Sequence, residues 1–198
     1  MRRVFIKLLL NYAWWINRKD ADGNNIFEGG FLGLDNISVF DRSKPLPLGY
    51  QPKQADATGW MAMFALHMTV IALELTQTDP EYEDIAIQTY EQFLGICDAL
   101  SGHGTGRPSM WDARSGFFKD LIIGPDGAWR HIDVYSLMGL IPLFATEVVD
   151  QRLLNRAPRF RDRLRRHKGG LFRGNYVCAC PDWENDRTST SYRSSITP

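Results

Sequence analysis

The chain has 198 residues, of which 44% are hydrophobic, 23% charged and 12% aromatic, and its formal net charge is zero. This is the composition of an ordinary globular protein, and it excludes a disordered chain, a collagen-like fibre and a disulfide-stapled miniprotein. The three cysteines, Cys97, Cys178 and Cys180, are few and odd in number, which is typical of a reducing compartment, so we expect a cytoplasmic location.

The N-terminal segment predicts a helix over residues 4–18. Its apolar residues recur at intervals of three and four, the period of one face of an α-helix. Lys7 and Asn11 interrupt the apolar run and no small-residue cleavage site follows, so we interpret the segment as a helix of the fold rather than a leader. No stretch of the chain approaches the roughly 18 to 20 apolar residues that a membrane span needs.

Residues 19–54 form a long connection that is rich in Gly, Asn, Asp and Pro and has no sustained period. A connection of this length without regular structure is uncommon in a compact domain unless it has a function. Apolar spacing then predicts a helix over residues 55–77 and a third helix that extends to Leu100. Asp79 is expected to cap this third helix, with Pro80 in its first position.

Short strands are expected next, over residues 110–134, with turns at 114–116 and 125–127. The helical period returns over residues 136–149, where Pro142 predicts a kink. Because strands and helices do not alternate, the order predicts an all-α domain with long loops and a small β-hairpin-like insert, rather than a parallel α/β sheet.

The zero net charge hides an asymmetry. Residues 1–150 carry 12 Lys and Arg against 19 Asp and Glu, a balance of −7, whereas residues 151–198 carry 11 against 4, a balance of +7. Nine of the later cations lie between Arg152 and Arg173, a density that can mark a nucleic-acid or anionic-membrane surface.

We favour a solvated face of a basic helix over about residues 158–167. Phe160 and Leu164 are four residues apart, as inward-facing positions on a helix are, and exposed aromatic residues are not interleaved with the cations. We therefore expect neither a nucleic-acid partner nor a membrane partner.

The long loop concentrates acids, amides and aromatic residues, which is the composition of a carbohydrate site. Sugar hydroxyls pair with Asp, Asn and Arg, sugar rings stack on aromatic faces, and glycosidic cleavage needs two carboxyls with different pKa values. A bland polar loop fits this composition almost as well. The segment DADGNN is similar to the start of a calcium loop, but Asn25 and Phe31 stand where that pattern needs Gly and Glu. We expect no metal and no cofactor.

The segment NRKDADGNNIFEGGFLGLDNISVFDRSKPLP closely resembles bacterial and fungal glucosidase-like proteins related to glycoside hydrolase family 63, the group of the processing α-glucosidases and mannosylglycerate hydrolases. Several glycines, acids and aromatic residues of this segment match in register. The resemblance continues through QADATGWMAMFALHMTVIALEL, MWDARSGFFKDLIIGPDG and HKGGLFRGNYVCACPDWENDR, and it covers nearly everything from Phe5 to Arg187.

This resemblance implies a partial (α/α)6 toroid built of helical hairpins and an inverting glycoside hydrolase that acts on α-glucosides, α-mannosides or related oligosaccharides. In inverting enzymes one acid protonates the leaving oxygen while a second carboxylate, about 6.5–9.5 Å away, activates water. The family motif E-x-G-x-D-N-S is matched inexactly by EGGFLGLDNIS, which makes Asp35 the candidate general acid, with Asp41 and Glu28 as rivals.

The resemblance also implies residues that contact the substrate. Asp56 and Trp60 are similar to substrate-contacting positions at the start of an inward helix, although Trp60 fits the apolar stripe of its helix equally well. Trp111 and Asp112 resemble a sugar-facing pair. The substrate-binding candidates are Glu28, Asn36, Asp41, Arg42, Asp56, Trp60, Trp111 and Asp112.

The C-terminal end departs from the family. The family's catalytic base is a Glu beyond the matched region, and Glu184 has no claim to that role merely as the last Glu of the chain. We therefore expect an incomplete hydrolase domain over residues 1–187, about half of a toroid, followed by a disordered tail over residues 188–198.

The expected partners are an oligosaccharide or glycoside and the remainder of the domain. Two alternatives stay open: a catalytically inactive carbohydrate-binding or truncated fragment, and a polyanion-binding protein that uses its basic end.

Overall fold

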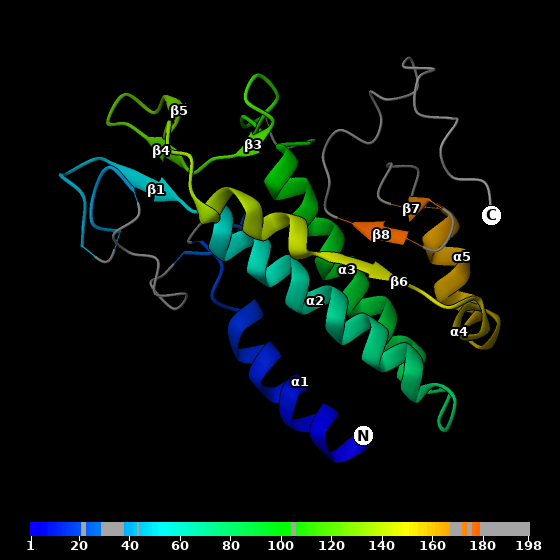
Figure 1. Ribbon diagram of the computed structural model, residues 1–198. Coiled ribbons are helices and arrows are strands. Elements are labelled where there is room, and N and C mark those ends of the chain that lie inside the picture. The colour runs from blue at the N-terminus through cyan, green and yellow to red at the C-terminus, as the bar shows by residue number, and fades with distance from the viewer. Residues whose placement is uncertain are drawn as a thin grey trace, which may run out of the picture.

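Helices dominate the structure, and short antiparallel strands pair beside them (Figure 1). The expectation of an all-α domain is therefore only partly right. The computed structural model describes residues 1–20, 23–28, 38–42, 44–103 and 106–166, together with the backbone of residues 172–173 and 176–178.

The core is built on two long helices, α2 (Ala55–Leu75) and α3 (Tyr82–Ser101), which pack against each other as a hairpin. The hydroxyls of Thr69 and Thr89 lie 2.9 Å apart across this contact, so each of these two buried hydroxyls has a partner on the other helix. The predicted cap is wrong, because α3 begins at Tyr82 and its N-cap residue is Glu81. Asp79 lies in the preceding turn, where its side chain accepts from the N–H of Glu81 at 3.1 Å.

Helix α2 corrects one expectation from the sequence. Within the described part of the chain, it is the one helix that is long and apolar enough to cross a membrane by length and composition. The rest of the protein buries 61% of its most apolar window, and a buried core helix passes the same test. We interpret α2 as the central helix of the core.

Helix α1 (Arg2–Ile16) packs on the α2–α3 hairpin through aromatic residues. The ring of Tyr12 meets that of Phe64 edge to face at 5.1 Å, and its hydroxyl donates to Gln92 Oε1 at 2.7 Å. Phe5 packs in the same way against Tyr82 of α3, with the ring centroids 5.7 Å apart. The first predicted helix is confirmed.

The single kinked helix predicted over residues 136–149 is wrong in its second half. The chain forms a 3₁₀-helix, η2 (Leu137–Phe144), and then a strand, β6 (Thr146–Val148). Close packing explains why η2 needs its glycine, since a Cβ on Gly139 would lie 2.2 Å from the ring of Phe117. Proline cannot donate a backbone hydrogen bond, so Pro142 also opposes a continuous α-helix.

Two short helices follow, α4 (Gln151–Arg156) and α5 (Pro158–Arg166). Phe160 and Leu164 of α5 are buried, and the Phe160 N–H donates to Glu83 of α3 at 3.0 Å. The predicted basic helix and its two inward positions are therefore confirmed.

The described strands form three small sheets, and all their pairings are antiparallel. The sheet β1–β4–β5 adjoins the N-terminal end of α2, because β1 ends two residues before that helix begins. The turns predicted at 114–116 and 125–127 join β2 to β3 and β4 to β5, whereas β1 was not predicted. The remaining strands are β1 (Gln51–Lys53), β2 (Trp111–Asp112), β3 (Phe117–Phe118), β4 (Leu121–Ile123), β5 (Trp129–His131), β7 (Phe172–Arg173) and β8 (Tyr176–Cys178), and the last two pair with β6 in the order β6–β8–β7.

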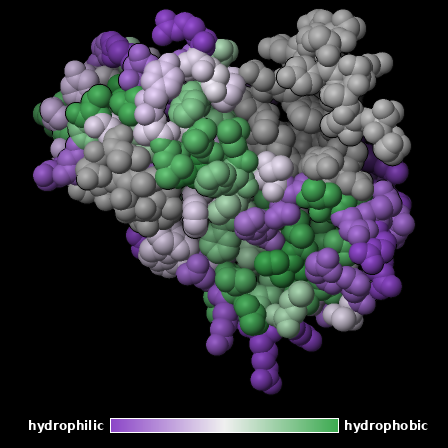
Figure 2. All heavy atoms as spheres, in the orientation of Figure 1, coloured by the Kyte–Doolittle hydropathy of each residue, from purple (hydrophilic) through white to green (hydrophobic). Residues whose placement is uncertain are grey.

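An apolar surface covers η2 and its flanks, and it is the green area over η2 in Figure 2. Exposed apolar residues gathered in one place commonly mark an interaction surface. The exposed apolar residues of this surface are Tyr135, Leu137, Leu140, Leu143, Phe144 and Val148.

Candidate functional site

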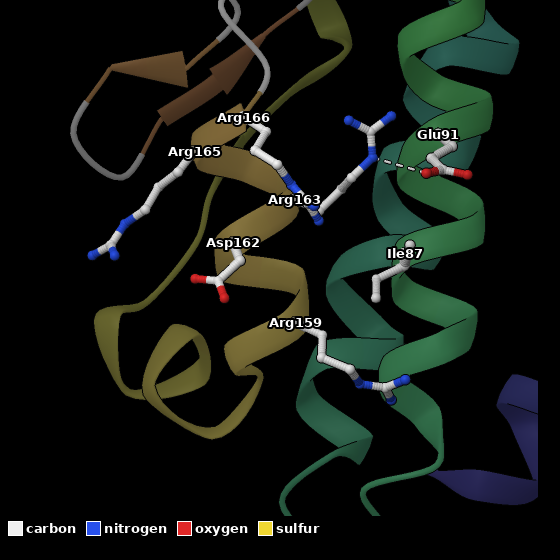
Figure 3. A pocket seen from close by; sticks show the side chains of 7 residues that line it. All are labelled: Ile87, Glu91, Arg159, Asp162, Arg163, Arg165 and Arg166. Carbon is white, nitrogen blue, oxygen red and sulfur yellow. Dashed lines mark hydrogen bonds and ion pairs between the residues drawn. The ribbon is translucent and has the colours of Figure 1, made fainter.

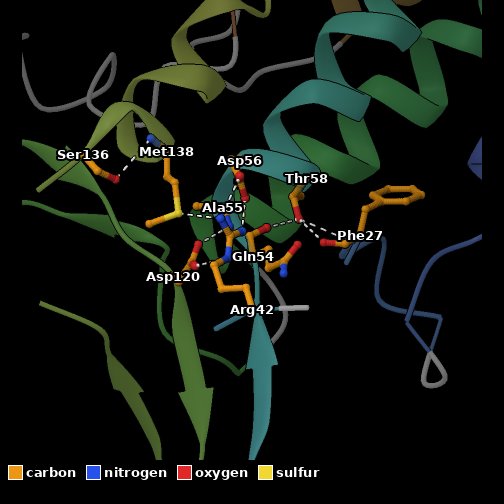
Figure 4. A network of polar contacts seen from close by, with 9 residues as sticks. All are labelled: Phe27, Arg42, Gln54, Ala55, Asp56, Thr58, Asp120, Ser136 and Met138. Atoms are coloured by element: carbon orange, nitrogen blue, oxygen red, sulfur yellow. Dashed lines mark hydrogen bonds and ion pairs between the residues drawn. The ribbon is translucent and has the colours of Figure 1, made fainter. Parts of the chain in front are cut away.

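A buried ion pair between Arg42 and Asp56 lies at the N-terminal end of α2 (Figure 4). Asp56 is in the first turn of α2, and Arg42 comes from the loop that precedes β1. Each terminal nitrogen of Arg42 donates to one oxygen of Asp56, with Nη1 at 3.0 Å from Oδ2, in the forked geometry that guanidinium and carboxylate groups favour. Nη1 also contacts the sulfur of Met138 in η2. Two predicted substrate contacts thus bind each other.

A second carboxylate, Asp120, joins this pair from the residue before β4. Its Oδ1 accepts from the N–H of Ala55, the first residue of α2, at 2.8 Å, and its Oδ2 lies 3.4 Å from Arg42 Nε. Burial raises the pKa of Asp120 to about 6, and the charge of Arg42 opposes the rise. We call Arg42, Asp56 and Asp120 the α2 cluster; its formal charge is −1 when both acids are ionised.

The two described ends of the long loop both return to this end of α2. At one end, Glu28 accepts from the buried Lys53 of β1 at 2.8 Å, and the N–H of Phe27 donates to Thr58 Oγ1 in the first turn of α2 at 3.1 Å. At the other end, Arg42 is held in the α2 cluster. The described residues on both sides of positions 29–37 therefore bind at or beside the start of α2.

The candidate general acid Asp35 and its neighbour Asn36 lie outside the described residues, as do all of residues 29–37. Its rival Asp41 is near the surface, where its Oδ2 lies 2.9 Å from Lys44 Nζ. Asp41 therefore directly precedes Arg42 of the α2 cluster in the chain and pairs with Lys44 near the surface.

Trp60 lies on α2 one turn beyond Asp56, and 38% of its surface is exposed. It is therefore not part of the buried core, and its contact with a substrate stays a prediction. The preceding residue, Gly59, packs directly on η2, where a Cβ would come within 2.5 Å of Pro142. Close packing at Gly59 fixes this part of α2, while the indole of the next residue reaches solvent.

The predicted pair Trp111 and Asp112 belongs to the β2–β3 hairpin. The indole of Trp111 packs edge to face on Phe118 at 5.1 Å. Asp112 accepts from the buried Nζ of Lys119 at 2.8 Å, and hydrogen bonds from Lys119 and Ser115 hold the pKa of Asp112 well below its usual range. Because Lys119 directly precedes Asp120, the hairpin and the α2 cluster meet at adjacent residues of the chain.

Sequence reasoning missed three buried charged residues at this end of the molecule: Lys53, Lys119 and Asp120. A signal for two of them existed in the segment FFKDLII, where Lys and Asp interrupt an apolar strand pattern. Charged residues inside such a pattern are buried only when they are paired. In the part of the chain that the structure describes, no group of three or more His, Cys, Asp or Glu side chains could hold a metal ion.

A second charged region lies between the basic helix α5 and helix α3. Charged side chains of both helices line a hollow of about 680 Å³ there (Figure 3). Arg163 Nε donates to Glu91 at 2.8 Å. Arg159 donates to Glu83 at 3.0 Å and to Asp84 at 2.7 Å. Two arginines of the basic helix are thus paired with acids of α3.

The chain is similar to one curated protein of the yeast Saccharomyces cerevisiae, the uncharacterized protein YMR196W. The two are 45% identical over 175 residues, which make up 83% of this chain but only 16% of the yeast protein. No family model matches the chain, and no solved structure matches it.

Proposed function

We propose that this chain forms the acid-bearing, sugar-facing part of a glycoside hydrolase domain that acts on α-glucosides, α-mannosides or related oligosaccharides. The observation that carries the proposal is that both described ends of the loop are bound at the start of α2, close along the chain to the exposed indole of Trp60. A loop rich in acids and amides beside an aromatic face is suited to sugar hydroxyls and ring faces.

In the proposed site, some residues anchor the loop and others contact the sugar. Glu28 and Arg42 would hold the ends of the loop through Lys53 and Asp56. Trp60 would stack on a sugar ring, and Asp35, from the same loop, would donate a proton to the leaving oxygen. Asp56 would then act as a positioning residue, because its carboxylate is occupied by Arg42.

A partial (α/α)6 toroid is the proposed architecture. The α2–α3 hairpin supports it as a packed pair of long helices, the unit from which such a toroid repeats. The chain spans 16% of the yeast protein that it resembles, so we propose that the general base belongs to another part of a longer polypeptide.

A second function, sugar binding without hydrolysis, is favoured by the state of the described carboxylates. Asp56 is paired with Arg42, Glu28 with Lys53 and Asp112 with Lys119. A carboxylate bound to a cation in this way is poorly placed to activate water. None of these three acids is therefore suited to act as the general base.

Turnover of α-glucosyl and α-mannosyl disaccharides by the longer polypeptide that contains this chain, and by its Asp35→Asn variant, separates the two functions. Asp126→Asn is the matched control, because Asp126 is an exposed turn residue paired with Arg130. Turnover that Asp35→Asn alone abolishes supports the hydrolase. Binding without turnover supports the second function, and equal turnover by all three proteins would remove Asp35 from the mechanism.

A further inference from the structure

The α2 cluster contains more buried acid than base. Asp56 and Asp120 are 2% and 4% exposed, and Arg42 is 8% exposed. One guanidinium therefore faces two carboxylates where water is largely excluded. A buried ion is stable only when nearby charges and hydrogen bonds replace its hydration, so the second carboxylate is the weaker partner of this cluster.

The contacts of the two acids identify Asp120 as that weaker partner. Both oxygens of Asp56 accept from the terminal nitrogens of Arg42. Asp120 Oδ1 accepts from Ala55 N–H, whereas Oδ2 is buried at 3.4 Å from Arg42 Nε and has no hydrogen bond within the described residues. Oδ2 is thus an oxygen on which a proton could reside without breaking a hydrogen bond.

Arg42 from the loop and Asp56 from α2 are the charged groups that act on Asp120 within the described residues. From η2, the thioether of Met138, which does not titrate, contacts Arg42. The two nearby lysines serve other acids: Lys53 binds Glu28, and Lys119 binds Asp112 and Asp133.

We propose that Asp120 is a proton-operated switch, which takes up one proton at Oδ2 in mildly acidic solution and so removes the charge of one of the two described carboxylates that pair with Arg42. The proton comes from solvent, and the carboxylate becomes a neutral carboxylic acid. Burial, which raises the pKa of Asp120 to about 6, supports a transition in this range. The proposal goes beyond the proposed function and does not depend on sugar binding.

Such a switch changes how the loop is attached to the core. Above the transition, Arg42 joins the loop to both α2 and the residue before β4. Below it, the ionic attachment to Asp120 is lost and the forked pair with Asp56 remains. Protonation also changes the group that caps Ala55, because Oδ1 then belongs to a neutral acid and accepts more weakly.

The switch is tested by nuclear magnetic resonance of the full chain between pH 4.5 and 8. The amide of Ala55 should shift in one step with a midpoint near pH 6. That step should vanish in Asp120→Asn, which retains an oxygen at this position but cannot ionise, and persist in Asp133→Asn, whose carboxylate contacts Lys119 near the same strands.

The ¹³C carboxyl signal of Asp120 in the unmodified chain gives the same midpoint without a variant, so the test survives a folding defect in Asp120→Asn. A carboxyl midpoint near pH 4 would overturn the proposal. An Ala55 step that persists in a folded Asp120→Asn would also overturn it. Neither result bears on sugar binding, so failure here is distinct from failure of the proposed function.

Discussion

The α2 cluster and the charged hollow between α3 and α5 contain the same chemical groups in opposite surroundings. In the α2 cluster, Arg42 and two carboxylates are buried. In the hollow, Arg163 and Glu91 are bound at a similar distance, but water reaches both side chains. Burial rather than distance therefore decides how much each arginine contributes to stability, because water can replace a lost partner in one place and not in the other.

Arg42→Met should give the largest effect. It leaves Asp56 and Asp120 without their buried cation, so the free energy of unfolding should fall by about 3–5 kcal/mol at pH 7.5. Urea denaturation measures this change. The loss should be smaller at pH 5, where Asp120 is protonated. A loss below about 1 kcal/mol at pH 7.5 would show that the buried arginine contributes no more to stability than an exposed one.

The pH dependence that Asp120 confers should be the next largest effect. Its pKa is raised from 3.8 to about 6, so its contribution to stability is complete below pH 3.8 and is lost as the pH rises through 6. The unmodified chain should therefore gain about 1.4 kcal/mol more than Asp120→Asn when the pH falls from 7.5 to 5. Urea denaturation of both proteins at both pH values gives this difference. Equal gains would show that Asp120 titrates normally.

Arg163→Met should lower the free energy of unfolding by less than about 1 kcal/mol, because its pair with Glu91 is open to solvent. Salt screens exposed pairs more than buried ones, so this loss should shrink further in 1 M NaCl while that of Arg42→Met persists. Denaturation at low and high salt measures both. A large loss of unfolding free energy in Arg163→Met that does not depend on salt would show that the Arg163–Glu91 pair behaves as a buried one.

The smallest effect on unfolding is expected from Leu140→Ser, because Leu140 is an exposed residue of the apolar surface over η2. Its stability should stay within about 0.5 kcal/mol of the unmodified chain, as for other surface changes. Urea denaturation of both proteins measures this, and a marked loss of stability would show that Leu140 packs as a core residue.

The sequence predicted the parts of the fold whose signal is local. Helices α1, α2, α3 and α5 follow from the spacing of their own apolar residues. Strand β1 has three residues and exists through pairing with β4, about 70 residues later, so no local pattern could reveal it. The end of the helix predicted over 136–149 failed because contacts of η2 with α2 and β3 decide its form.

The candidate site was predicted as residues but not as contacts. Arg42 and Asp56 were both named from the sequence, yet their pairing with each other was not, since 14 positions separate them in the chain. Asp120 was missed because its partners, Ala55 and Arg42, lie more than 60 residues earlier. Asp35 stays a prediction.

The central claim, a sugar site at the start of α2, is tested most directly by titrating the ¹⁵N-labelled chain with an α-glucosyl disaccharide and following the indole N–H signals. The Trp60 signal should shift saturably and Trp60→Ala should abolish binding. Trp14→Ala should leave binding intact, because Trp14 is a second exposed tryptophan, 50% exposed on α1, that takes part in none of the proposed contacts. Binding that survives Trp60→Ala, or the absence of any shift for α-glucosyl and α-mannosyl ligands, would contradict the claim.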